Sequence, residues 1–246
     1  MEKVINLKLL SWYKKNKRSL PWRQEQNNKL PNPYYIFVSE YMLQQTTVST
    51  VTKRFNKFIK KWPTLKKLSK TSESSILSFW SGLGYYSRAR NLLKASKLIE
   101  KNFMGQIPKN FNDLICLPGI GEYTANAILG IGYNKPTMPL DTNIERIIAR
   151  IFCYQNPISD IKKKLQKKSI TFISPRSSSK LIQAFMDYGS LICTPRNPKC
   201  YDCLIKIHCK SYSKNLENLI PIKKKKKLKK LKKFSRAYII FNEKNE

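Results

Sequence analysis

The chain has 246 residues, of which 41% are hydrophobic and 11% aromatic, so it can build a substantial core and is not a disordered or low-complexity protein. Its formal net charge of +33 favours a polyanion such as nucleic acid as partner, although the abundant lysine also fits the codon bias of an AT-rich genome. No signal-peptide pattern occurs at the N-terminus and no stretch approaches the roughly 20 apolar residues of a membrane span, so we expect a soluble, cytoplasmic protein.

Helical periodicity dominates the predicted elements. The first helix, over residues 3–16, places Val4, Leu7 and Leu10 on one face. Further helices are predicted, in chain order, over residues 34–45, 47–62, 73–80, 86–102, 122–132, 142–152 and 179–191. A lysine-rich stretch at 223–233, interpreted as a linker or solvated tail, precedes a short β-prone run at 237–241. Because strand signals are nearly absent elsewhere, the sequence predicts an all-α fold.

One carboxylate lies inside the apolar helix predicted at 34–45. Glu40 is surrounded in sequence by residues such as Ile36, Phe37 and Met42, and a carboxyl group among them would be paired or raised in pKa, which suits a general acid. The alternative is that Glu40 lies on a polar side of the helix beside Ser39, and periodicity alone favours this second interpretation.

Two turns carry aromatic residues beside arginines. Trp22 and Arg23 follow a proline, and Tyr85 and Arg88 follow a pair of glycines at 82 and 84. Such pairs suit stacking or intercalation with nucleic-acid bases. They also occur at ordinary helix starts and as caps on a core, so each motif alone is weak.

The segment 116–150 organises the rest of the chain. Its turn LPGIG, from Leu117 to Gly121, can aim backbone amides at an oxyanion such as phosphate, or can be only a tight connection between helices. Asp141 begins the helix predicted at 142–152, where it can be an N-cap or an isolated reactive carboxylate.

Four cysteines cluster near the end of the predicted helices, with six, two and five residues between them: Cys193, Cys200, Cys203 and Cys209. Thiolates at these spacings can close around Zn²⁺ or an iron–sulfur cluster, and the spacing does not decide between them. Disulfides are not expected in an intracellular protein, and we interpret the adjacent His208 as a bystander.

Together, LPGIG, the following LDTN and the cysteine spacing resemble the helix-hairpin-helix DNA glycosylases, and in particular the [4Fe–4S] loop of endonuclease III and of MutY-type adenine DNA glycosylases. Tyr123 stands where the endonuclease III type carries the lysine that forms a Schiff base, which favours the MutY-type branch. The stretches SEYMLQQTTV at 39–48 and GLGYYSRARN at 82–91 also resemble that branch.

The resemblance implies two helical subdomains with a cleft between them, a six-helix barrel that contains the hairpin and an iron–sulfur cluster subdomain. The expected boundaries are 1–24 for an N-terminal helix that packs with the cluster subdomain, 25–133 for the barrel, 134–218 for the cluster subdomain, and 219–246 for the linker and the remnant of a C-terminal domain. Because that domain recognises 8-oxoguanine in the family, we expect the protein to excise adenine but to discriminate weakly for 8-oxoguanine as the opposite base.

The resemblance also implies roles for individual residues. Glu40 would protonate the adenine leaving group, Asp141 would stabilise the sugar cation, and Tyr123 and Asn143 would orient them. DNA contacts are expected from Leu117, Gly119, Gly121, Gln45, Tyr85, Arg88, Trp22 and Arg23. The four cysteines would hold one structural [4Fe–4S] cluster.

The implied partner is double-stranded DNA with adenine opposite 8-oxoguanine or guanine, bound by a monomer at the bacterial nucleoid. The implied reaction flips the adenine out of the duplex and excises it by hydrolysis. Two alternatives stay open, a DNA-binding relic without turnover and an endonuclease III-like glycosylase/lyase for pyrimidine lesions.

Overall fold

A computed structural model describes residues 1–24, 30–222 and 224. The regular elements in this part of the chain are helices, so the all-α prediction is confirmed. The α-helices are α1 (Glu2–Asn16), α2 (Pro33–Leu43), α3 (Val48–Lys61), α4 (Leu65–Ser69), α5 (Glu73–Trp80), α6 (Ser87–Phe103), α7 (Phe111–Ile115), α8 (Glu122–Ala127), α9 (Thr142–Phe152), α10 (Lys162–Ser169) and α11 (Ser178–Leu191). The β-prone run at 237–241 and, except for Lys224, the lysine-rich stretch at 223–233 lie outside the described residues.

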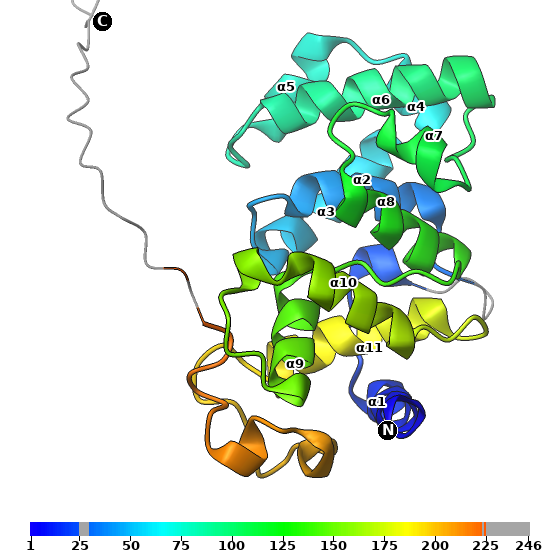
Figure 1. Cartoon of the computed structure of the whole chain (residues 1–246). Coiled ribbons are helices and arrows are strands. Elements are labelled where there is room, and N and C mark those ends of the chain that lie inside the picture. Colours follow the sequence, from blue (N-terminus) through cyan, green and yellow to red (C-terminus); the bar gives the residue numbers. More distant parts are fainter. Residues whose placement is uncertain (25–29, 223, 225–246) are drawn as a thin grey trace, which may run out of the picture.

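The helices form two groups with α2 between them. Figure 1 shows α4 to α7 at one end of the molecule, and α1, α9, α10, α11 and the cysteine segment at the other. Helix α2 packs against α3, α6 and α8, and every residue from Ile36 to Met42 is buried. A helix covered on all sides carries no polar face, so each polar group on it needs a partner inside the protein.

Small residues let α2, α11 and the end of α8 approach closely. Helix α8 continues as a π-helical turn over Ile128–Gly132, which packs against both α2 and α11. A Cβ added at Gly130 would lie 2.2 Å from the Cδ1 atom of Ile182 on α11, and one at Gly132 would lie 3.2 Å from the Cα atom of Pro33 on α2. These contacts fix the central helices relative to one another.

Helix α1 joins the second group through a different face from the predicted one. Ile5, Leu9 and Tyr13 are the buried residues, whereas Val4 and Leu7 are 43% and 70% exposed, so the predicted face was wrong. Apolar residues occur at helical spacing on two faces of α1. The face that carries Ile5, Leu9 and Tyr13 is the buried one, because α1 packs against α11.

The N-terminal helix also contacts the cysteine segment. The Nζ atom of Lys8 donates a hydrogen bond to the carbonyl oxygen of Leu204 at 3.0 Å. The contact joins residues 1–24 to the cysteine segment, while the grouping of residues 1–24 with the cluster subdomain and the subdomain boundaries stay predictions. No helix in the described ranges is long and apolar enough to cross a membrane.

Candidate active site

Glu40 lies at the centre of α2, and its side chain is only 7% exposed. The interpretation that it lies on a polar side of the helix was wrong, because its neighbour Ser39 is also fully buried. The carboxyl group of Glu40 is hydrogen-bonded by the phenol of Tyr123, which comes from α8. The sequence segments at 40 and 123 therefore meet in one site.

Burial is the main influence on the acidity of this carboxyl group. The pKa of Glu40 is raised from its ordinary value of 4.5 to about 7, mainly by burial and in smaller part by the nearby charge of Asp141. The positive charge of Arg23 and the hydrogen bond from Tyr123 act in the opposite direction. Near neutral pH, Glu40 can therefore both hold and release a proton.

Asp141 is the N-cap of α9, and both of its oxygens accept hydrogen bonds. Oδ1 accepts from the backbone amide of Ile144 at 2.7 Å, and Oδ2 accepts from Nδ2 of Asn143 at 2.8 Å. Burial raises the pKa of Asp141 above its ordinary value, while these two bonds and the charge of Arg146 lower it. An arrangement in which both oxygens accept suits the ionised carboxylate, and the positive end of the α9 dipole suits it as well.

A buried arginine connects this carboxylate to the cysteine segment. Arg146, on the second turn of α9, donates from Nη2 to Oδ1 of Asn143 at 2.8 Å and from Nε to the carbonyl oxygen of Cys193 at 2.7 Å. Gly189 of α11 makes room for this chain of contacts, since a Cβ there would lie 2.6 Å from that of Asn143. Sequence reasoning missed Arg146, although its position three residues after Asn143 on one helix was the available signal.

A polar pocket opens beside Tyr123, between α8, α9 and α10. The residues that line it include Tyr123, Glu122, Glu145, Lys162 and Gln166. Gln166 of α10 donates a hydrogen bond to Glu122 of α8 at 2.7 Å across this pocket. The site is therefore open to a polar ligand on the side of the phenol.

The LPGIG turn is attached to the end of α2. The hydroxyl of Tyr41 donates to the carbonyl oxygen of Pro118 at 2.5 Å, and Nε2 of Gln44 donates to that of Gly119 at 3.1 Å. Gly119 has φ +81°, and a Cβ there would lie 2.9 Å from the ring of Tyr41, so only glycine fits without strain.

Leu117 is placed differently from its expected role in DNA contact. Its side chain is 5% exposed and its amide donates to the carbonyl oxygen of Leu114, so it anchors the turn instead of offering a donor. Among the described residues, neither Gly119 nor Gly121 donates its amide to a protein acceptor, so these two amides remain available.

Two side chains stand out from the surface on loops near the end of α2. Gln45 is exposed with φ 58°, and Tyr85 is 62% exposed with φ 47°. Left-handed backbone at residues other than glycine is uncommon and concentrates at functional positions. Arg88, predicted to contact DNA with them, is instead 5% exposed and donates to backbone carbonyls, so its guanidinium is not presented at the surface in this structure.

Trp22 and Arg23 also lie inside the protein. Trp22 is 3% exposed, with its ring 5.5 Å from that of Phe55. Nη1 of Arg23 lies 2.7 Å from Oδ1 of Asp187, a fully buried carboxylate that Arg18 also contacts. Trp22 therefore offers no free surface in this structure, and Arg23 lies close enough to Glu40 for its positive charge to lower the pKa of that carboxyl group.

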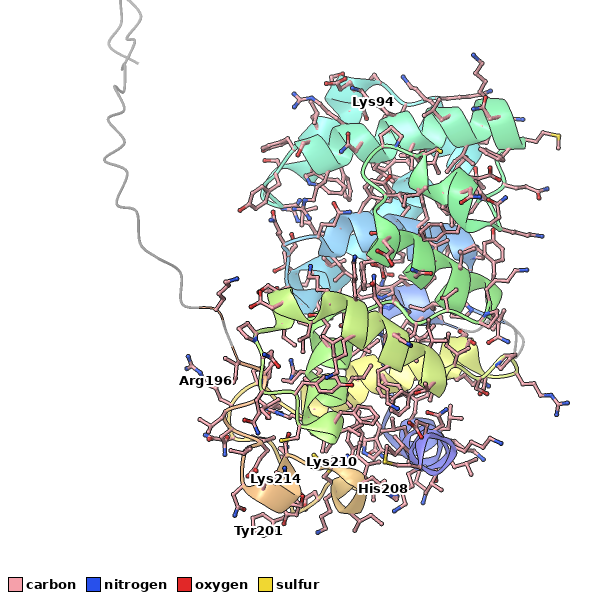
Figure 2. All side chains as sticks on the ribbon, in the orientation of Figure 1. Lys94, Arg196, Tyr201, His208, Lys210 and Lys214 are labelled. Carbon is pink, nitrogen blue, oxygen red and sulfur yellow. The ribbon has the colours of Figure 1, made fainter. Side chains whose placement is uncertain are left out.

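The four clustered cysteines line one pocket whose walls include Ile147, Ile151, Ile192 and Ile205. Arg150 closes one side, with Nη1 3.2 Å from Sγ of Cys193, and the lining does not include His208. Within residues 1–24, 30–222 and 224, no group of three His, Cys, Asp or Glu side chains is arranged so that it could hold one metal ion. Figure 2 shows Arg196 projecting at the edge of this segment.

Comparison with known proteins agrees with this geometry. Residues 38–171 match the family model described as "HhH-GPD superfamily base excision DNA repair protein". The chain is 43% identical over 220 residues to the adenine DNA glycosylase of Buchnera aphidicola subsp. Baizongia pistaciae, an alignment that covers 89% of this chain and 61% of that protein. The chain thus spans about three fifths of this relative's length.

Two solved structures share the fold. A thermostable thymine-DNA glycosylase is 29% identical, with a TM-score of 0.78 over 87% of this chain and 97% of that chain. Endonuclease III in a non-covalent complex with DNA is 19% identical, with a TM-score of 0.69 over 88% of this chain and 98% of that chain. The second likeness concerns the fold alone.

Proposed function

The chain belongs to the HhH-GPD superfamily of base excision DNA repair proteins, and we propose that it is an adenine DNA glycosylase without strong lyase activity. Its substrate is double-stranded DNA with adenine opposite 8-oxoguanine or guanine. The observation that carries this proposal is the pairing of a buried, proton-holding Glu40 with a carboxylate at Asp141 around Tyr123. A phenol cannot form an imine, so the site suits hydrolysis.

In the first step, the target adenine leaves the base stack and enters the site. Glu40 then gives its proton to the adenine ring as the bond between base and sugar breaks, and burial keeps that proton available near neutral pH. The hydrogen bond from Tyr123 orients the carboxyl group for this transfer.

The sugar becomes positively charged as the base leaves, and Asp141 stabilises this cation through its carboxylate. Asn143 and the amide of Ile144 hold both oxygens in place, so the negative charge needs no reorganisation during the reaction. Water then adds to the sugar, and the products are free adenine and an abasic site.

Single-turnover cleavage of labelled duplexes tests this proposal. The duplexes carry adenine opposite 8-oxoguanine, guanine or thymine, and each is analysed with and without alkali. We expect strand breaks from the first two duplexes only after alkali treatment, and the ratio of their rates measures discrimination for 8-oxoguanine. If the protein is folded and binds DNA but produces no abasic site from any duplex, the proposal is wrong and the interpretation as a DNA-binding relic remains.

Cys193, Cys200, Cys203 and Cys209 fit a [4Fe–4S] cluster. Four thiols line one apolar-walled pocket, and the resemblance of their spacing to the [4Fe–4S] loop of endonuclease III and MutY-type glycosylases supports a cluster over a single zinc ion. When bound, the cluster would act as a structural tie, because hydrolysis transfers no electrons. The cluster would hold Cys193, whose carbonyl oxygen accepts from Arg146.

Replacement of Cys203 by serine tests the cluster. We expect the purified wild-type protein to contain iron and sulfide in equal amounts, and C203S to lose both, because a serine hydroxyl is a poor ligand for iron–sulfur clusters. The thermal midpoint should fall with the iron content. Cys116→Ser is the matched control, since Cys116 lies outside this pocket. Stoichiometric zinc without sulfide in the wild type would contradict the assignment.

The two hairpin glycines provide a paired prediction on DNA binding. Gly119→Ala should lower the free energy of unfolding by about 1–3 kcal/mol, because φ +81° is strained for alanine and the new Cβ meets Tyr41. Gly121→Ala should leave stability unchanged, since nothing lies within 4 Å of its Cβ position, yet weaken binding by crowding the phosphate. Thermal melts and binding titrations at fixed salt check both; unchanged affinity in G121A would exclude the hairpin as a phosphate site.

One observation favours a second activity to be tested in parallel. Lys162 lines the same pocket as Tyr123, so it could supply an amine for a Schiff base on the abasic sugar. Borohydride trapping on a duplex that contains an abasic site decides this point. A trapped adduct that Lys162→Ala abolishes would assign lyase activity to this amine, and no adduct is expected from a monofunctional enzyme.

A further inference from the structure

Two neighbouring loops carry the exposed residues Gln45 and Tyr85. The Gln45 loop comprises residues 44–47 and leaves the C-terminus of α2, and the Tyr85 loop comprises residues 81–86 and leads into α6. In the proposed function, these side chains enter the duplex as the target adenine leaves it. Insertion requires a rigid support, since a loop that yields cannot separate stacked bases.

Arg88 connects these two loops from below. Its Nη1 atom donates to the carbonyl oxygens of Met42 at 2.7 Å and Tyr41 at 3.3 Å, at the end of α2. Its Nη2 atom donates to the carbonyl oxygens of Leu83 at 2.8 Å and Gly84 at 3.0 Å. One planar guanidinium therefore binds carbonyls three residues before Gln45 and directly before Tyr85.

The surroundings of Arg88 leave its guanidinium little freedom. The side chain is 5% exposed, and its Cζ atom lies 5.5 Å from the centre of the Trp80 ring. The indole of Trp80 donates to the carbonyl oxygen of Gly84 at 3.2 Å, so the same loop is held from two directions. Met42 and Tyr41 belong to the last turn of α2, whose carbonyls lack partners within the helix.

We propose that Arg88 is a positioning residue that locks the Gln45 and Tyr85 loops into one rigid wedge, so that base flipping depends on its guanidinium although Arg88 itself is buried away from DNA. This proposal rests on the proposed function. A lysine at this position keeps the positive charge but lacks the planar fork, so it cannot hold both pairs of carbonyls at once.

The experiment measures base flipping directly. The probe is a duplex with a 2′-fluoro-adenosine target opposite guanine, which resists cleavage, and 2-aminopurine beside the target, which brightens when the target leaves the stack. We compare the wild type, Arg88→Lys and the matched control Arg90→Lys, because Arg90 lies on the same helix and pairs with the exposed Glu73. Iron content and thermal midpoint are measured for every protein.

We expect the flipping equilibrium to fall about tenfold or more in R88K and to stay at the wild-type value in R90K, with unchanged pH dependence of excision. In a Tyr85→Ala background, R88K should add little, because both changes remove the same wedge. Should R88K fail to fold, Gly84→Ala strains the same loop at φ +71° without removing the buried charge, and it should reduce flipping in the same way.

Two different failures can be told apart. Equal flipping in R88K and R90K, or fully additive losses in the double variant, would overturn the positioning role while leaving the proposed function intact. Absence of both flipping and excision in the wild type would instead contradict the proposed function itself.

Discussion

Replacement of Glu40 by glutamine is expected to lower the rate of adenine excision by about 10²–10⁴-fold, the usual loss when a general acid is removed. The side chain keeps its size and its hydrogen-bonding capacity towards Tyr123 but has no acidic proton to donate. Single-turnover excision from a duplex with adenine opposite guanine measures the loss. DNA affinity should stay near the wild-type value, and a rate within threefold of wild type, or about half a logarithmic unit, would exclude Glu40 as the acid.

The pKa of the same residue determines how the excision rate of the wild type should depend on pH. Because the pKa of Glu40 is raised to about 7, the acid form dominates below this pH and the excision rate should fall about tenfold per pH unit above it. This descending limb should be absent in E40Q. A wild-type rate that stays level from pH 6 to about 9 would show that another group supplies the proton.

Burial of ionised Glu40 should also lower the free energy of unfolding at high pH. Its folded-state pKa lies above the ordinary value of 4.5, so the folded protein binds more protons than the unfolded chain between these two values. Stability therefore falls as pH rises through about 4.5 to 7, by at most about 3 kcal/mol. E40Q should melt at a higher temperature than the wild type at pH 8 and at a similar temperature at pH 4.

Asp141→Asn is expected to lower excision by about three orders of magnitude, because it removes the negative charge that stabilises the sugar cation from the N-terminus of α9. Asparagine is as good an N-cap as aspartate, so the thermal midpoint should not fall. Single-turnover rates, with the iron content of both proteins matched, measure the effect.

A matched variant controls for the loss of one negative charge elsewhere in the protein. Asp113→Asn changes a carboxylate in the first turn of α7 that does not line the pocket beside Tyr123, and should leave the rate unchanged. Retention of more than about one tenth of the wild-type rate in D141N would contradict a role for the charge in the transition state.

Parts of this structure followed directly from local sequence signals. Helices α5 and α9 were predicted with their observed bounds, because Ser72 and Asp141 cap their first turns and apolar periodicity continues to their ends. The five-residue helix α4 was not predicted, since a single turn has too little periodicity to detect. A helix before the LPGIG turn was expected without bounds, and α7 occupies that position.

The site was harder to predict than the fold. Periodicity placed Glu40 on a polar face, because it cannot register that α2 is surrounded by other helices. Arg88 and Arg146 are charged residues whose partners are backbone carbonyls from distant segments, and only the tertiary structure brings those carbonyls to them. The resemblance, not the periodicity, carried the pairing of Glu40 with Asp141.

Incubation in ¹⁸O-labelled water tests the central claim most directly. A duplex with adenine opposite 8-oxoguanine is treated with the wild-type protein, and the products are weighed by mass spectrometry. Hydrolysis assisted by Glu40 and Asp141 predicts free adenine and an abasic sugar that carries one ¹⁸O atom, before exchange with the solvent, and no protein–DNA adduct after borohydride. Release of adenine through a trapped covalent imine, or no release of adenine, would contradict the account.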